Sequence, residues 1–120
     1  MTVQDPRAEQ TIELSVRQPA PGVTVLAVSG EVDMVSAPAL RDALVNGLGD
    51  GGTFVVDMTG VTFLGSAGLA VLVEAARLAQ KAGTALKVVA TARAVTRPLE
   101  ATGLGEVLSV SDSVDAALGS

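Results

Sequence analysis

Hydrophobic and polar positions follow two different periods within residues 54–81. Residues 54–56 form an unbroken apolar run that ends at Asp57, which is typical of a strand buried on both faces. From Leu69 onward, apolar residues recur at helical spacing and charged residues occupy the opposite face. The pattern therefore predicts a buried strand, a polar turn, and an amphipathic helix from about Ser66 to Lys81.

Patterns typical of strands and of helices also alternate along the rest of the chain. Residues 12–16 alternate apolar and polar side chains, as in an edge strand with one face in water, and the turn composition of residues 18–22 predicts a hairpin with the next strand. Strands separated by helices predict an α/β fold with a mostly parallel sheet. The other predicted elements are strands at residues 23–28, 54–57, 85–90 and 107–110, and helices that begin at Ser36, near Val95 and at Ser111 or Asp112.

Two serines stand where helices are predicted to begin. Ser36 can cap a helix that has Pro38 in its first turn and a buried leucine stripe that ends at Leu48. Ser66 either caps the free N–H groups of its helix or stands out into solvent, where a phosphate would meet the positive end of the helix dipole. Spacing alone favours the cap, which is the commonest role of a serine at such a place.

Composition bounds the size of the fold and excludes several kinds of chemistry. The 120 residues are 48% apolar, enough for one domain over residues 11–120, and the polar residues 1–10 are predicted to be a disordered tail. Cysteine and histidine are absent, which excludes disulfides, thiolate or imidazole metal sites and a Ser-His catalytic pair. The carboxylates of Glu31, Asp33 and Asp57 lack the spacing of a calcium loop, so no metal or other cofactor is expected.

Charge and hydropathy restrict the partners. A formal charge of −5, no cluster of Lys or Arg and only two aromatic residues disfavour direct binding of nucleic acid. The longest uncharged stretch, residues 58–73, is short for a membrane span and is interrupted by glycines, threonines and a serine. The first residues lack the pattern of a secretory signal, so the expectation is a cytoplasmic protein without a membrane partner.

Two motifs that suggest enzymes do not fit their contexts. Gly47, Gly49 and Gly52 match the glycine spacing of a dinucleotide-binding loop, but they follow a predicted helix and precede a strand, which is the reverse order. The serine turn differs from the nucleophile elbow of hydrolases because Leu64 replaces its first glycine, and no histidine is present to act as a base. We therefore do not expect an enzyme.

Two segments together resemble the anti-sigma factor antagonist family, whose fold is the STAS domain. They are VVDMTGVTFLGSAGLAVL at residues 55–72 and GEVD at residues 30–33. The resemblance covers nearly the whole chain and implies an open, mixed sheet of four to five strands with helices packed on one side. It also implies that the loop after the third strand and the start of the second helix form a docking face. The same resemblance implies that the GEVD loop and the Ser66 turn lie at one end of the sheet.

The resemblance further implies a partner-switching function in bacterial transcription and stress response. In this family, the serine corresponding to Ser66 is phosphorylated by an anti-sigma factor that is also a serine kinase, and the unphosphorylated form binds that partner and frees the sigma factor. A phosphoserine phosphatase is the expected second partner. The residues expected at the partner are Glu31, Asp33, Met34, Ser36, Thr59, Gly60, Gly65, Ser66, Ala67 and Gly68, and structural roles are expected for Asp57 and Gly68.

Two positions depart from the family pattern. Gly65 stands where many members have Asp, which bears on the choice of kinase, and Ala67 stands where many have a second hydroxyl residue. Ser66 is therefore the only hydroxyl at this turn. One alternative function stays open, an accessory subunit that docks on a membrane transporter ATPase without being phosphorylated. Association with a small kinase and a sigma factor, or with a transporter ATPase, would discriminate between the two functions.

Overall fold

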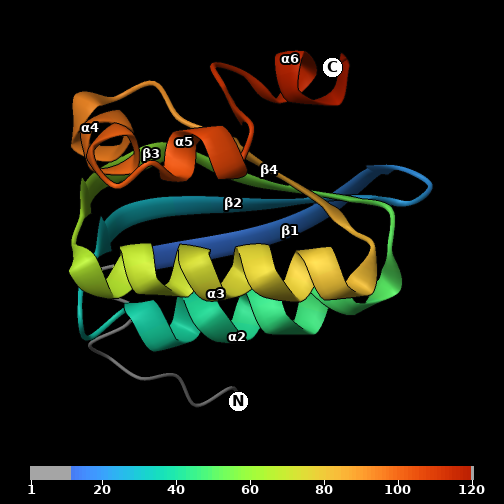
Figure 1. The fold of residues 1–120 in the computed structure, drawn as a ribbon, viewed down its shortest axis with the longest axis horizontal. Coiled ribbons are helices and arrows are strands. Elements are labelled where there is room, and N and C mark those ends of the chain that lie inside the picture. The colour runs from blue at the N-terminus through green and yellow to red at the C-terminus, as the bar shows by residue number, and fades with distance from the viewer. Residues whose placement is uncertain (1–11, 120) are drawn as a thin grey trace.

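Five strands form one mixed sheet in the computed structural model, which describes residues 12–119 (Figure 1). The strands are β1 (Ile12–Ala20), β2 (Val23–Val32), β3 (Thr53–Leu64), β4 (Ala85–Val89) and β5 (Val110–Ser111), and their order across the sheet follows the chain. β1 pairs antiparallel with β2, and all other neighbours pair in parallel. The predicted edge hairpin and mostly parallel sheet are confirmed. The predicted tail at residues 1–10 lies outside the described residues.

Helices connect the parallel strands and cover both faces of the sheet. They are α2 (Ala37–Gly47), the short 3-10 helix η1 (Leu48–Asp50), α3 (Ser66–Ala82), α4 (Arg93–Ala101), α5 (Leu104–Val107) and α6 (Val114–Gly119). The two long helices, α2 and α3, lie side by side along one face (Figure 1). On the opposite face, Ala117 of α6 packs against Val25, Val55 and Val89. The expectation of helices on one side therefore holds for α2 and α3 but not for α6.

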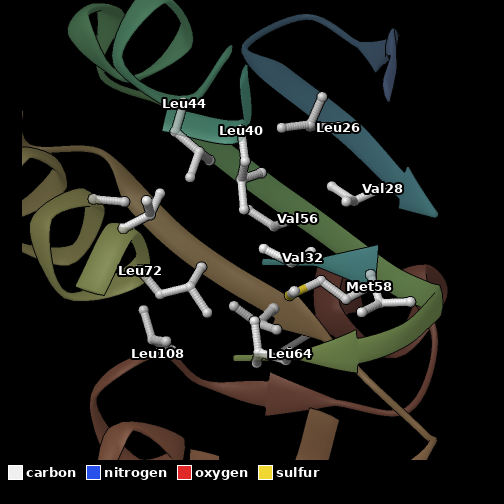
Figure 2. Packing of buried hydrophobic residues seen from close by; sticks show 14 of the residues in the cluster. Leu26, Val28, Val32, Leu40, Leu44, Val56, Met58, Leu64, Leu72 and Leu108 are labelled. Carbon is white, nitrogen blue, oxygen red and sulfur yellow. The ribbon is translucent and has the colours of Figure 1, made fainter. Parts of the chain in front are cut away.

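The main core lies between the sheet and the two long helices (Figure 2). Leu40 and Leu44 of α2 and Leu72 of α3 are almost fully buried in it. Within β3, residues 54, 56 and 58 face this core, whereas Val55 faces the second cluster under α6. Both faces of β3 are covered, which is why its first half reads as an unbroken apolar run. Complete burial of such a side chain contributes roughly 1.5–3 kcal/mol to the free energy of unfolding.

β3 continues well past Asp57, where the sequence pattern ended it. Beyond that point the buried residues are Met58, Val61 and Leu64, spaced by three instead of two. Two register shifts against β2 produce this spacing, because each one adds a residue to β3 and turns the following side chains to the other face. A period of three does not indicate a strand, so the hydrophobic pattern could not extend the prediction past Asp57.

Two boundaries in the first half of the chain also differ from the prediction. β1 extends through Ala20, across an irregularity in its register with β2, so only Pro21 and Gly22 form the turn. Leu48 is buried as expected, but it belongs to η1 rather than to the last turn of α2. For the end of β1 and for Leu48, the side chains have the predicted polarity or burial. Only the backbone conformation differs from the prediction.

The C-terminal elements differ more. The predicted strand at residues 107–110 is confined to β5, because Val107 ends α5 with 65% of its surface exposed and Ser109 adopts a positive φ of 52°. The predicted caps of the last helix, Ser111 and Asp112, are wrong. The hydroxyl of Ser113 accepts the N–H of Ala116 at 3.0 Å and caps α6 instead.

Candidate functional site

The carboxyl ends of β2 and β3 bring two turns together at one end of the sheet. Val32 lies opposite Leu64 in the parallel ladder, and the N–H of Gly65 donates to the carbonyl of Val32 at 2.9 Å. Residues 33–36, which follow β2, therefore lie beside the turn that leads into α3. The predicted meeting of the GEVD segment with the serine turn is confirmed. In α/β sheets, this end of the parallel strands is where ligands commonly bind.

Ser66 is the first residue of α3, and its side chain is exposed. Gly65 occupies the N-cap position in an extended conformation, and its carbonyl accepts the N–H of Leu69 at 3.1 Å. No side-chain hydrogen bond caps this helix. The interpretation of Ser66 as an N-cap is therefore wrong. Its hydroxyl stands at the surface, at the positive end of the α3 dipole.

Gly68 sets the distance between the first turn of α3 and the sheet. It is buried, and a Cβ added to it would lie 2.6 Å from both Cδ1 of Leu64 and Cγ1 of Val32. Such separations are too short for carbon atoms, so only glycine lets the helix backbone approach this closely. Gly68 therefore permits the close packing of α3 on the sheet, and its burial keeps it out of direct contact with a partner. Ala67, by contrast, is half-buried.

Gly65 leaves room for the ring of Phe63. A Cβ at Gly65 would lie 3.0 Å from Cε2 of Phe63, a separation that requires the ring to shift. The ring itself is 49% exposed. Many members of the resembled family have Asp at the position of Gly65. The glycine here lets the exposed ring of Phe63 lie close to the backbone that leads into Ser66.

A cluster of hydrogen bonds closes the turn after β2. Oδ1 of Asp33 accepts the N–H of Val35 at 2.9 Å and the N–H of Ser36 at 3.0 Å, and the Ser36 hydroxyl oxygen lies 3.2 Å from it. The same hydroxyl lies 2.8 Å from the carbonyl of Glu31, to which it donates, and it accepts the N–H of Asp33 at 3.0 Å. We call the paired side chains of Asp33 and Ser36 the clasp. The hydrogen bond from the backbone of Ser36, the largest effect, holds the pKa of the Asp33 carboxyl below its usual value.

The clasp corrects the predicted role of Ser36 as a helix cap. Ser36 occupies the N-cap position of α2, yet its hydroxyl makes no capping bond to that helix and turns back toward Glu31. Its side chain is fully buried, so it cannot touch a partner directly. Asp33 is partly exposed, but its Oδ1 is already engaged within the turn. Glu31 is exposed at the end of β2, opposite Phe63.

Three apolar side chains are exposed around these two turns. Met34 is 82% exposed, Val35 is 44% exposed, and Phe63 is 49% exposed. Of these three, only Met34 is among the residues that the sequence predicted at the partner, and Val35 and Phe63 are not. An available signal was the rarity of Phe63, one of two aromatic residues in the chain, in a polar stretch. Exposed apolar groups gathered at one place are typical of a surface that binds another protein.

Asp57, Thr59 and Gly60 lie on a different part of the surface. Oδ1 of Asp57 accepts the N–H and the hydroxyl of Thr59 at 3.1 and 2.8 Å. With residues of β1 and β2 these three border a shallow hollow of about 260 Å³, whose lining includes neither Met34 nor Ser66. In the parallel ladder Gly60 lies opposite Ser29, so Thr59 and Gly60 come before the ends of β2 and β3 that lead into the two turns.

Two features are absent from residues 12–119. No group of three or more acidic side chains is arranged so that it could hold a metal ion within this part of the chain. None of the helices described there has the length and apolar character needed to cross a membrane.

Comparison with known proteins defines the class of the fold and then the family. Residues 15–117 match the family model of the STAS domain. A crystal structure of an anti-sigma factor antagonist from Mycobacterium paratuberculosis superimposes with a TM-score of 0.83 at 36% identity, covering 98% of this chain and 97% of the other.

Two curated relatives give the same result. The anti-sigma-F factor antagonist RsfB of Mycobacterium tuberculosis is 36% identical over 100 residues, which cover 81% of this chain and 80% of RsfB. The anti-sigma-B factor antagonist of Bacillus subtilis is 31% identical over 84 residues, or 70% and 77% of the two chains. The chain therefore belongs to the anti-sigma factor antagonists of the STAS domain family, which are non-enzymatic regulators.

Proposed function

We propose that this chain binds an anti-sigma factor with serine kinase activity at the end of the sheet that carries Ser66, and that phosphorylation of Ser66 switches the binding off. The unphosphorylated chain would release the sigma factor held by that partner, and a phosphoserine phosphatase would restore the active form. The observation that carries the proposal is an exposed serine hydroxyl with no capping role, at the first position of α3 and beside exposed apolar side chains.

The proposed contact surface combines both turns. It consists of Glu31, Met34, Val35, Phe63, Gly65, Ser66 and Ala67, with Thr59 and Gly60 as a separate, outlying contact. Asp33, Ser36 and Gly68 support this surface from within. Apolar groups at its centre supply the burial that drives association, and the serine supplies the point at which charge can be added.

The local charges support a switch of this kind. A phosphate at Ser66 adds close to two negative charges at neutral pH, and the positive end of the α3 dipole makes that charge tolerable within the fold. On a contact surface that fits a neutral serine, the same charge would have to be desolvated and would repel acidic groups of the partner. Binding is therefore expected to weaken while the fold persists.

The test uses the anti-sigma factor that is purified with this chain and identified by mass spectrometry. Incubation with ATP and magnesium should place one phosphate on Ser66, found by peptide mapping, and the phosphorylated chain should lose affinity for that partner. Ser66→Ala should accept no phosphate and keep its binding. A phosphate on another residue, or equal affinity of the two forms, would contradict the proposal. Recovery of a transporter ATPase instead of an anti-sigma factor would favour the alternative function.

A further inference from the structure

We propose that Asp33 is a positioning residue, which fixes the exposed Met34–Val35 turn for docking through hydrogen bonds from its Oδ1 rather than through its negative charge. The consequence for docking rests on the proposed function above, whereas the consequence for the turn concerns the free chain alone. The inference departs from the sequence expectation that Asp33 meets the partner directly.

The geometry of the turn supports this role. Two backbone N–H groups, those of Val35 and Ser36, donate to one atom, Oδ1 of Asp33, and the Ser36 hydroxyl oxygen lies 3.2 Å from the same atom. The carbonyl of Asp33 also accepts the N–H of Ala37 at 2.8 Å, which ties the turn to the first residue of α2. Both ends of the segment that carries Met34 are therefore held by Asp33.

The buried hydroxyl of Ser36 supplies the other half of the clasp. It lies 2.8 Å from the carbonyl of Glu31 and 3.0 Å from the N–H of Asp33, so it fastens the turn to the last residues of β2. Ser36 is 0% exposed, and among the described buried side chains no polar atom lacks a hydrogen-bond partner. A fully satisfied cluster of this kind specifies one backbone conformation.

A fixed backbone matters here because Met34 and Val35 have no core to hold them. Met34 is 82% exposed, so its position on the docking surface is set by the backbone of the turn. If the turn without the clasp adopts the binding geometry one time in ten, the apparent affinity falls about tenfold with no contact changed. The clasp therefore acts on binding by keeping the turn in the docking conformation.

Two variants of Asp33 separate the hydrogen bonds from the charge. Asp33→Asn keeps an acceptor in the position of Oδ1 and removes the charge, whereas Asp33→Ala removes both. Asp42→Ala is the matched control, because it removes an exposed carboxylate from α2 without touching the clasp. Amide hydrogen exchange at Val35 and Ser36 reports on the turn in the free chain, and titration with the purified anti-sigma factor reports on docking.

In Asp33→Ala, the amides of Val35 and Ser36 should exchange about tenfold faster or more, and the affinity for the anti-sigma factor should fall by a similar factor. Asp33→Asn should rescue both quantities to within about threefold of the parent, and the control should match the parent.

An Asn variant as defective as the Ala variant in exchange and binding would overturn the inference in favour of charge. Unchanged exchange in Asp33→Ala would overturn it as well. A parent chain that does not bind the anti-sigma factor would defeat the proposed function, while the exchange rates would still decide whether the clasp fixes the turn.

Discussion

At the scale of single residues, Ser66 and Asp33 occupy similar places in the chain but have different surroundings. Each follows a strand of the same parallel pair, yet the Ser66 hydroxyl is exposed and caps nothing, whereas Oδ1 of Asp33 accepts hydrogen bonds from two backbone N–H groups. Substitution at Ser66 should therefore leave the fold intact. Removal of the hydrogen-bond acceptor at Asp33 should alter the local structure.

Replacement of Ser66 tests whether binding and stability separate. Because Gly65 and not Ser66 is the N-cap of α3, Ser66→Ala should change the free energy of unfolding by less than about 0.5 kcal/mol, below the usual 0.5–2 kcal/mol for loss of a cap. Ser66→Asp should stabilise the helix by about 0.3–1 kcal/mol through its dipole and should weaken binding of the anti-sigma factor. Urea unfolding and binding titrations of both variants provide the measurements. A loss of 1 kcal/mol or more in Ser66→Ala would show that the hydroxyl has a structural role.

Acid titration tests the clasp in a second way. The pKa of Asp33 is lowered in the folded state, chiefly by the N–H of Ser36, so the unfolded chain binds this proton more readily. The resulting stabilisation is fully present above the unfolded pKa, about 3.9, and is lost as the pH falls through the lower pKa of the folded state. The free energy of unfolding of the parent should therefore decline relative to that of Asp33→Asn as the pH drops below about 5. Parallel pH profiles for the two proteins would contradict this prediction.

At the scale of elements, the position of α3 against the sheet presents the serine. Gly68 permits close contact with Val32 and Leu64, and the Gly65 N–H joins the start of the helix to the end of β2. On the solvent-exposed side, Arg41 of α2 forms a bidentate ion pair with Glu74 of α3. The distances are 2.7 Å from Nε to Oε1 and 2.9 Å from Nη2 to Oε2, so the pair connects the two long helices at the surface. Because exposed ion pairs contribute little, the glycine contact is the stronger constraint on the helix.

Substitution of Gly68 tests that constraint. Alanine favours a helix by about 1 kcal/mol over glycine, but a methyl group 2.6 Å from Leu64 and Val32 overpacks the contact by about 1–3 kcal/mol. Gly68→Ala should therefore be destabilising, by up to about 2 kcal/mol. Gly105→Ala is the control, because nothing lies within 4 Å of its added Cβ and its helix should gain between zero and about 1 kcal/mol. If denaturant unfolding shows both variants equally stabilised, the close approach at Gly68 is not a constraint.

At the scale of the whole molecule, stability comes mainly from one core on one side of the sheet. The cluster under α2 and α3 contains the large buried leucines, whereas the cluster under α6 has only three valines and an alanine buried at its centre. Unfolding of α6 should therefore cost less than unfolding of the main core, since it exposes less apolar surface.

Truncation in the main core gives the corresponding prediction. Leu72 is 0% exposed, so Leu72→Ala should lower the free energy of unfolding by about 2–5 kcal/mol, a large part of the 5–15 kcal/mol usual for a domain. Val73→Ala is the control, because the side chain of Val73 is 38% exposed. This variant should change the free energy of unfolding by no more than about 0.5 kcal/mol. Thermal and urea unfolding measure both. Equal losses would mean that the two faces of α3 are not buried as described.

Local patterns in the sequence predicted much of this arrangement. The apolar run at residues 54–56, the helical period from Leu69 and the alternation at residues 12–16 correctly predicted the central strand, the long helix and the edge strand. The two segments of the family resemblance also indicated which turns meet. These features depend on neighbours along the chain, and local spacing is enough to reveal them.

Only the tertiary structure decided how the site is formed. The two register shifts of β3 bring Phe63 opposite Glu31, and no local pattern specifies a bulge against a distant strand. The roles of Ser66, Ser36 and Ser113 also depended on which backbone groups came within reach, since the same hydroxyl can cap a helix, fasten a turn or face solvent. The sequence by itself determined the fold class and the position of Ser66 at the start of its helix, and the packing of β2 against β3 determined which side chains surround that residue.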